Sequence, residues 1–241
     1  MKIAYLPAVL SAVALTATTL HAGLVTWNAP ANIAGDSDVS TNGTLIEAYN
    51  FAGEATTVNG VNFQPFNMGA MSNPAGTSTY SVTSSIVNNS NTGSAFAPFS
   101  TLLPAYKTLL GTAAGRGDST MTLTMSGLSI GGNYEFQTWV NDPRDFSGTI
   151  FSMTVTSGDA VTLDPGAGTE GSLGQYVIGT FVADAPTQTV EFFGSEIGVV
   201  NGYQLRQIIA PVPEPGTILF GMALVGAAGC ARRRPAGGAG F

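Results

Sequence analysis

The sequence predicts an all-β sandwich with one short helix, placed between two apolar terminal segments. Three observations predict this fold. Apolar and polar residues alternate along short runs such as TMTLTM at 120–125, and this alternation is typical of strands with one buried face. Turn-forming Gly, Asn, Asp and Pro separate the runs at spacings typical of a sandwich. One middle segment, residues 101–110, has apolar residues at helical spacing.

The alternating runs give the predicted strands in chain order. They are residues 24–27, 44–50, 58–63, 79–87, 120–125, 133–140, 149–156, 175–182, 187–193 and 202–209. The run 133–140 is expected to direct alternate side chains to opposite faces of a sheet, Tyr134, Phe136 and Val140 to one and Glu135, Gln137 and Trp139 to the other. Asn59-Gly60 suits a tight hairpin turn, because such turns need positive φ.

The predicted helix covers residues 101–110 and ends at Gly111. Pro104 falls in its first turn, where a missing backbone N–H is tolerated. We expect this helix to pack over one edge or end of the sandwich.

The first 22 residues have the pattern of a secretory signal peptide. Lys2 precedes an apolar stretch, and the small residue Ala22 occupies the expected cleavage position. A permanent N-terminal membrane anchor is the alternative. The chain therefore divides into a signal peptide at 1–22, a β-sandwich domain at 23–210 and a C-terminal segment at 211–241.

The C-terminal segment joins three features in one order. Pro213, Glu214 and Pro215 precede an uncharged run at 217–231, which Arg232, Arg233 and Arg234 end. As a helix, a run of about 15 residues would reach roughly 22 Å, against about 30 Å for the hydrocarbon core of a bilayer. We expect it to insert in a membrane transiently, with the arginines on the cytoplasmic side.

This order closely resembles the PEP-CTERM sorting signal of Gram-negative bacteria that make extracellular polysaccharide. The signal peptide predicts export by the Sec machinery. The resemblance implies processing by an exosortase near the motif and delivery to the cell envelope, surface or extracellular matrix. The extension at 235–241 is longer than is usual after the arginines. An ordinary C-terminal membrane anchor with a proline-rich hinge is the alternative.

Several short segments of the domain resemble exported planctomycete and verrucomicrobial proteins that carry this tail. They are DVSTNG (38–43), TVNGVNF (57–63), YKTLL (106–110), GQYVIGTF (174–181) and NGYQLR (201–206). The resemblance implies a jelly-roll sandwich of the galactose-binding-like kind. It implies no activity, because this fold has many functions.

Composition excludes several functions for the domain. The single histidine, His21, and the single cysteine, Cys230, both lie outside residues 23–210. Catalytic triads, zinc sites of His or Cys, and disulfides therefore lack their essential groups. Within 23–210, four cationic side chains oppose fourteen carboxylates, a formal net charge of −10. This charge disfavours nucleic acid and permits cations or neutral polysaccharide as partners, or it simply maintains solubility.

The carboxylates near residues 135–145 suggest two kinds of site. Glu135, Asp142 and Asp145 lie near Trp139 in the sequence, and glycoside hydrolysis needs two carboxylates. The simpler alternative is that Arg144 pairs with one of the aspartates. No cofactor is required by the sequence, but Ca²⁺ could bind loop oxygens, with these candidate ligands: Asp36, Asp38, Asp142 and Asp145.

Sugar binding is the third kind of site. Trp139 or Tyr203 could stack on a pyranose ring, although a tryptophan buried in the core is the commoner arrangement. The sequence thus predicts a non-catalytic structural or carbohydrate-binding surface protein. A secreted carbohydrate-active enzyme that uses an Asp/Glu pair is the alternative.

Overall fold

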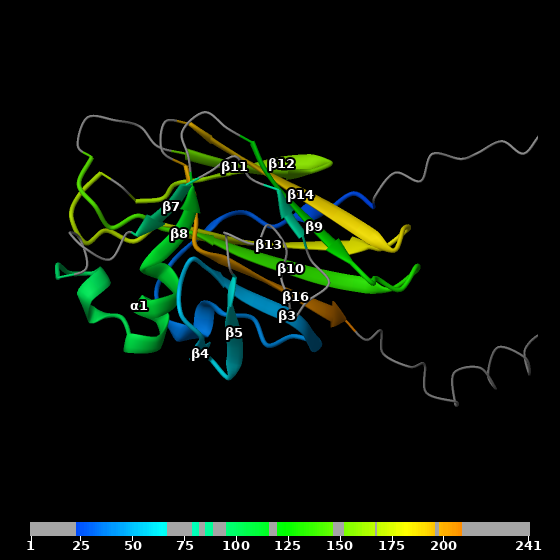
Figure 1. The fold of residues 1–241 in the computed structure, drawn as a ribbon, viewed down its shortest axis with the longest axis horizontal. Helices are drawn as coiled ribbons and strands as arrows, with labels where there is room; N and C mark the ends of the chain where they lie inside the picture. Colours follow the sequence, from blue (N-terminus) through cyan, green and yellow to red (C-terminus); the bar gives the residue numbers. More distant parts are fainter. Residues whose placement is uncertain are drawn as a thin grey trace, which may run out of the picture. The chain divides into compact units, whose positions relative to one another are not determined.

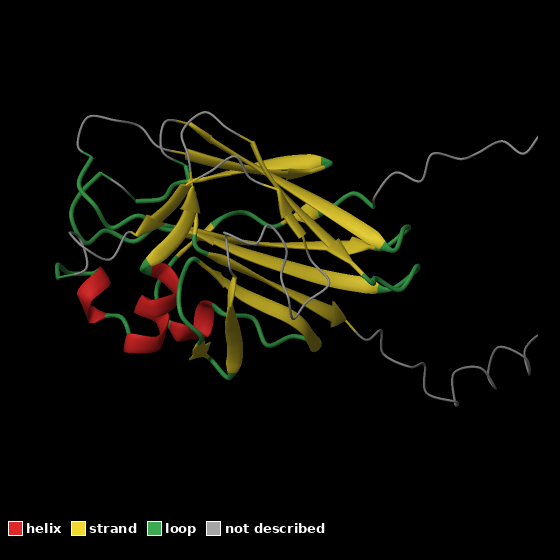
Figure 2. Ribbon diagram, in the orientation of Figure 1, coloured by secondary structure: helices red, strands yellow, loops and turns green. Residues whose placement is uncertain are grey.

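The computed structural model describes residues 23–66, 79–81, 85–88, 95–115, 120–146, 152–166, 168–195 and 198–208. The predicted signal peptide and the C-terminal segment lie outside these residues. Figures 1 and 2 show the described part as layers of strands, with the helical segments gathered at one end. Within it, no helix is long and apolar enough to cross a membrane.

The described residues form mostly strands. The strands are β1 (Thr26–Trp27), β2 (Ala31–Asn32), β3 (Thr44–Phe51), β4 (Thr56–Val58), β5 (Val61–Phe66), β6 (Thr79–Ser81), β7 (Ser85–Asn88), β8 (Thr112–Gly115), β9 (Thr120–Ser126), β10 (Asn133–Val140), β11 (Ser152–Ser157), β12 (Asp159–Leu163), β13 (Gln175–Val182), β14 (Thr187–Ser195), β15 (Val199–Val200) and β16 (Gly202–Ile208). The helices are α1 (Pro104–Leu110) and the 3-10 turns η1 (Asp36–Asp38) and η4 (Phe99–Thr101).

Two large sheets form the sandwich. Among the described residues, one sheet has eight strands in the order β1-β13-β10-β16-β3-β5-β4, with β2 also pairing with β13. The other has five strands in the order β12-β11-β14-β9-β6, and a small third sheet is β15-β8-β7. The chain crosses between the large sheets from β9 to β10, from β10 to β11 and from β13 to β14. This arrangement is consistent with the all-β sandwich predicted from the sequence.

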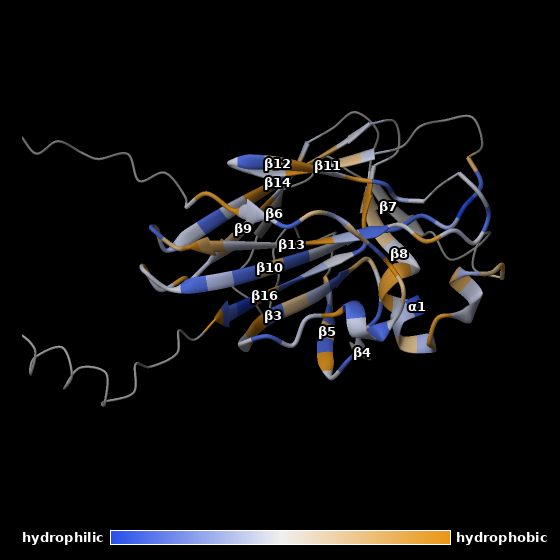
Figure 3. Ribbon diagram, turned by 180° about the vertical axis from the view of Figure 1, so that it is seen from behind, coloured by the Kyte–Doolittle hydropathy of each residue, from blue (hydrophilic) through white to orange (hydrophobic). Residues whose placement is uncertain are grey.

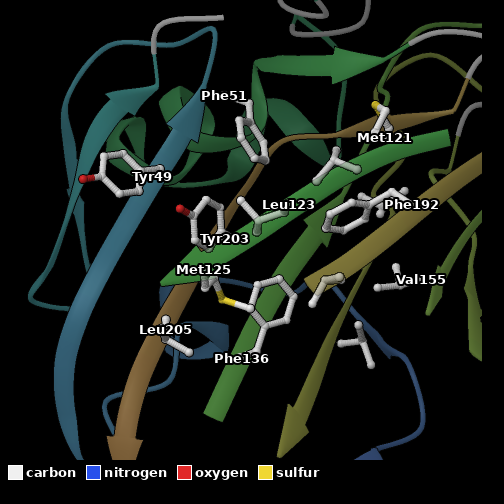
Figure 4. Close-up of a cluster of buried hydrophobic side chains, with 14 of the residues drawn as sticks. Tyr49, Phe51, Met121, Leu123, Met125, Phe136, Val155, Phe192, Tyr203 and Leu205 are labelled. Carbon is white, nitrogen blue, oxygen red and sulfur yellow. The ribbon is translucent and has the colours of Figure 1, made fainter. Parts of the chain in front are cut away.

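A large hydrophobic core lies between the two sheets (Figure 4). Its eight-stranded side includes Tyr49, Phe51, Phe136, Tyr203 and Leu205, and its five-stranded side includes Met121, Leu123, Met125, Val155 and Phe192. Complete burial of one such side chain contributes about 1.5–3 kcal/mol relative to an exposed position. Since residues 23–208 contain no cysteine, this burial and the sheet hydrogen bonds hold the domain together.

A second core covers the outer face of the eight-stranded sheet. The side chains of Trp139 and Ala48 on this face pack with those of α1 and of the β4–β5 hairpin. The helix lies at one end of the sandwich (Figure 1), and it also shields a sheet face, which the sequence did not indicate. The helix begins at Pro104, three residues later than predicted, and residues 99–101 form the separate 3-10 turn η4. Its predicted end before Gly111 is confirmed.

Two predicted strands are confirmed to the residue. The strands predicted at 133–140 and 175–182 are β10 and β13, and in Figure 3 the hydrophilic residues of β10 alternate with less hydrophilic ones. The hairpin turn predicted at Asn59-Gly60 is confirmed, because both residues have positive φ, 48° and 76°, and join β4 to β5. The predicted strand 58–63 is therefore interrupted by this turn, and its second half belongs to β5. The predicted strand 79–87 is divided between β6 and β7, which belong to different sheets.

Candidate functional site

Trp139 lies at the end of β10 and is fully buried, with 0% of its surface exposed. Its ring meets Phe63 edge to face, with 5.5 Å between the ring centroids. Its Nε1–H donates a hydrogen bond to the hydroxyl of Tyr106, at 3.1 Å. Neither face of the indole is open to a sugar, so the structure favours the core tryptophan that the sequence left as the alternative.

Tyr203 is also fully buried, in the core between the two sheets. Its ring stacks on Phe136 at a centroid distance of 5.8 Å, and its hydroxyl donates to Glu47 Oε1 at 3.1 Å. A ligand could reach this ring only if the sandwich opened. The stacking role predicted for Tyr203 therefore does not fit its position.

The hydroxyl of Tyr106 links Trp139 to the N-terminal turn. It donates to Asp38 Oδ2 at 3.1 Å, and the same oxygen accepts the backbone N–H groups of Ala34 and Gly35, at 2.7 and 2.9 Å. Burial, and next the negative charge of Asp38, raise the pKa of the Tyr106 phenol far above its ordinary value. Asp38 thus fixes a turn and holds α1 through Tyr106.

This raised pKa predicts a loss of stability in alkali. The unfolded chain releases the phenol proton near pH 10 whereas the folded chain retains it, so the contribution is complete below pH 10 and decreases as the pH rises further. We expect the free energy of unfolding to fall by about 1.4 kcal/mol per pH unit from this group above pH 10.

Urea titrations between pH 8 and pH 11.5 measure this slope of the free energy of unfolding against pH, and Tyr106→Phe should reduce it. Tyr176, whose pKa is also raised by burial and by Asp38, accounts for part of the remaining slope. Equal slopes in the wild type and Tyr106→Phe would contradict the assignment.

The carboxylate of Asp142 is committed to an ion pair. Asp142 is 1% exposed, and Arg144 donates to both of its oxygens, from Nε at 2.8 Å and from Nη2 at 2.6 Å. The Arg144 guanidinium lies 4.7 Å from the centroid of the Phe146 ring. This pairing is the simpler alternative that the sequence allowed for Arg144. Asp145 follows it in an exposed position.

Glu135 and Asp142 lie at opposite ends of β10. Glu135 lies near the start of β10, whereas Asp142 follows the end of the strand. The five residue steps from Glu135 to Val140 span about 17 Å of strand, which exceeds the roughly 5–9.5 Å between the carboxyl groups of glycosidases. Glu135 is 6% exposed and accepts hydrogen bonds from Ser40 Oγ and from Asn42 Nδ2.

The four aspartates predicted to bind calcium lie in two separate segments of the chain. Asp36 and Asp38 are in η1, and Asp142 and Asp145 follow β10. In the described ranges, no three side chains of Asp, Glu, His or Cys gather as metal ligands would. One oxygen of Asp38 and both oxygens of Asp142 are occupied by protein donors.

Residues 38–43 cover part of the outer face of the eight-stranded sheet. Gln137 donates to the carbonyl of Asp38 at 2.6 Å, and Gln204 to the carbonyl of Ser40 at 3.0 Å. Arg206 Nε donates to the carbonyl of Asn42 at 2.6 Å. The pKa of the Arg206 guanidinium lies below its ordinary value, because the effect of burial exceeds the opposite effect of the Glu135 carboxylate. With α1, this segment covers that face over β10 and β16, whereas Thr180 and Val182 of β13 are exposed.

The outer face of the five-stranded sheet is different, because it consists largely of hydroxyl side chains. We call it the hydroxyl face, and its members are Thr120, Thr122 and Thr124 of β9, Thr187, Thr189 and Ser195 of β14, Ser152, Thr154 and Thr156 of β11, and Thr162 of β12. Their neighbours along each strand, such as Leu123 and Val155, point into the core. Cross-strand hydroxyl pairs lie close together: Thr124–Thr189 at 3.4 Å, Thr154–Thr162 at 3.2 Å and Ser152–Ser195 at 3.1 Å.

Two other side chains of β14 project from the hydroxyl face. Phe193 is 47% exposed and lies in register between Thr120 and Thr154. Glu191 is exposed and lies in register between Thr122 and Thr156. Sequence analysis missed both, although the pair Phe192-Phe193 breaks the alternation of β14 by placing an aromatic ring on each face.

An open depression of about 600 Å³ borders the hydroxyl face. Its lining includes Leu24, Thr156, Ser157, Asp184, Thr189 and Glu191. Leu24 is 70% exposed and contributes an apolar wall, while the other five contribute hydroxyl or carboxylate groups. The depression therefore combines one apolar surface with several hydrogen-bonding groups.

Comparison with known proteins characterises the C-terminal segment. Residues 211–234 match the family model of the PEP-CTERM protein-sorting motif, which confirms the prediction for this segment. The motif implies processing by an exosortase and an exported, envelope-associated protein.

Other comparisons add little. No curated protein is significantly similar to the chain. A solved chain described as "Structural basis for the promiscuous specificity of the carbohydrate-binding modules from the beta-sandwich super family" is 13% identical. The match covers 59% of this chain and 71% of that one, with a TM-score of 0.15.

Proposed function

We propose that this chain is an exosortase substrate whose β-sandwich serves as a non-catalytic, carbohydrate-binding or structural component of the cell surface or extracellular matrix. The observation that carries the proposal is the sorting motif matched at residues 211–234. The open hydroxyl face supports a binding role, and the separation of Glu135 from Asp142 favours binding over hydrolysis.

The proposed route follows from the two ends of the chain. Residues 1–22 direct export through the Sec machinery and are removed after Ala22. The apolar run at 217–231 then holds the protein in the inner membrane, with Arg232, Arg233 and Arg234 on the cytoplasmic side. An exosortase cuts near Pro213, Glu214 and Pro215, and the domain reaches the envelope or matrix.

The domain that is delivered has few cationic groups. Its net charge of −10 makes a neutral polysaccharide a better partner than nucleic acid. We further propose that the sandwich is a jelly roll of the galactose-binding-like kind, from the planctomycete and verrucomicrobial group, and that it works without a cofactor.

Substitution of the motif glutamate tests the sorting step. We expect Glu214→Ala to leave most of the protein as an uncut, membrane-associated precursor, because the exosortase recognises the motif. Mass spectrometry of the C-terminus and fractionation of the native host measure this, with Glu54→Ala, an exposed glutamate of the domain, as the matched control. A mature wild-type protein that still ends at Phe241, or an unchanged destination for Glu214→Ala, would overturn the proposed processing.

A further inference from the structure

We propose that the hydroxyl face binds a chain of uncharged polysaccharide, with Phe193 as the platform for one sugar ring and the neighbouring depression as the site for another. This inference rests on the proposed function and assigns its binding surface. It replaces Trp139 and Tyr203, which the structure places in the cores, with residues that a polymer can reach.

The first argument is that the outer face of the five-stranded sheet is open, whereas the middle of the other outer face is covered. The second core and residues 38–43 cover the eight-stranded sheet over β10 and β16. On the five-stranded sheet, in contrast, Phe193 is 47% exposed, and Thr120, Thr162, Thr187 and Glu191 are also exposed. A long polymer needs such an open surface, because it cannot enter an enclosed cavity.

The position of Phe193 supports a role as a platform. An exposed phenylalanine alone is common on protein surfaces. Phe193, however, is part of a cross-strand row that runs Thr120, Phe193, Thr154 and Thr162. The row offers an apolar ring to the C–H face of a sugar and hydroxyl groups on both sides to the sugar's hydroxyls, each threonine Oγ being both donor and acceptor.

The depression supplies the groups that would orient a sugar ring. Its volume of about 600 Å³ is within the range of ligand sites, roughly 300–1,000 Å³. Glu191 and Asp184 can accept hydrogen bonds from sugar hydroxyls, and Leu24 provides an apolar wall. Glu191 is two residues from Phe193 on the same face of β14, about 6.8 Å along the strand, so one polymer chain could contact both.

Charge selects the class of polymer. In β6, β9, β11, β12 and β14, as the structure describes them, there is no lysine or arginine. Asp159 and Glu191 lie in these strands, and Asp184 borders the depression. An anionic polysaccharide would be repelled, whereas a neutral one would not. A second copy of the domain fits poorly, because the cores of homodimer interfaces are more apolar than this face.

Affinity electrophoresis of residues 23–210 in gels that contain neutral polymers tests the inference. The probes are hydroxyethylcellulose, laminarin, galactomannan and the neutral polysaccharide fraction of the native matrix, with alginate as the anionic comparison. We expect retention by at least one neutral probe and none by alginate. Phe193→Ala should weaken that retention about tenfold, and Glu191→Gln should weaken it several-fold.

The controls are exposed residues that lie off the hydroxyl face. Phe96→Ala removes an aromatic side chain that is 48% exposed, nearly the same as Phe193, and Glu54→Gln removes an exposed carboxylate. Circular dichroism confirms that each variant is folded, and analytical ultracentrifugation shows whether the face pairs two copies. If the wild type is retained and neither Phe193→Ala nor Glu191→Gln weakens the retention, the hydroxyl face is not the binding surface, while the carbohydrate-binding function stands. If the wild type forms dimers that Phe193→Ala abolishes, the assignment of the hydroxyl face to polysaccharide is also wrong. A wild type that no neutral probe retains would overturn the carbohydrate-binding function as well.

Discussion

Trp139→Ala should lower the free energy of unfolding by about 4 kcal/mol, the usual cost of removing a large aromatic side chain from a core. For a domain of this size the midpoint of thermal unfolding should fall by about 12 °C. The reason is the position of Trp139 where β10, α1 and the β4–β5 hairpin meet, with no exposed surface. The substitution would leave a cavity there and remove the hydrogen bond to Tyr106.

Two other substitutions separate the parts of this effect. Trp139→Phe keeps an aromatic ring but removes the N–H donor, and we expect it to cost about 2 kcal/mol. Trp27→Ala removes the other tryptophan of the chain, which is only partly buried, and should cost less than Trp139→Ala. Chemical denaturation measures all three. Below its unfolding temperature, Trp139→Ala should retain wild-type binding to polysaccharide, and a selective loss of binding with unchanged stability would restore Trp139 as a ligand-binding residue.

The sequence predicted the two faces of β10 but not their environments. Alternation correctly separated Tyr134, Phe136 and Val140 from Trp139, because side chains of a strand point to opposite faces in turn. It could not show that both faces are buried. The cover over Trp139 comes from α1, some thirty residues earlier in the chain, and from β5 still earlier, and periodicity within one strand contains no information on such distant partners.

Two segments singled out by resemblance meet in the structure. DVSTNG at 38–43 and NGYQLR at 201–206 are joined by hydrogen bonds from Gln204 to Ser40 and from Arg206 to Asn42 and Gly43. These contacts tie the backbone of residues 40–43 to the side chains of β16. Both segments therefore have a structural role in this fold.

The candidate site was harder to predict than the sorting signal. The motif around Glu214 depends on the order of neighbouring residues, which a sequence displays directly. The hydroxyl face instead depends on the register of β9, β11 and β14, which brings Thr120, Phe193 and Thr154 into one row from positions up to 73 residues apart. Each threonine alone is an ordinary strand residue, since β-branched side chains suit strands.

Asn201→Ala should lower the free energy of unfolding by about 3 kcal/mol, because it leaves several buried backbone groups without a partner. Asn201 is 0% exposed and connects three parts of the chain. Its Oδ1 accepts the backbone N–H of Asn141 at 2.6 Å, and its Nδ2 donates to the carbonyl oxygens of Leu110, Thr112 and Asn141, at 2.9, 3.0 and 3.1 Å. One amide thus fixes the end of α1, the start of β8 and the end of β10.

Asn201→Asp distinguishes hydrogen bonding from packing, because aspartate has nearly the same shape. It keeps an acceptor for the N–H of Asn141 but places a carboxylate oxygen against three carbonyl oxygens, so we expect it to destabilise the domain at least as much as Asn201→Ala. Asn32→Ala is the matched control, since its amide is exposed and bonds to Gln175, and it should change the free energy of unfolding by less than about 0.5 kcal/mol. Urea denaturation at pH 7 gives the three values. If Asn201→Asp were as stable as the wild type, shape alone would explain the position, and the amide would not be what joins α1 and β8 to the end of β10.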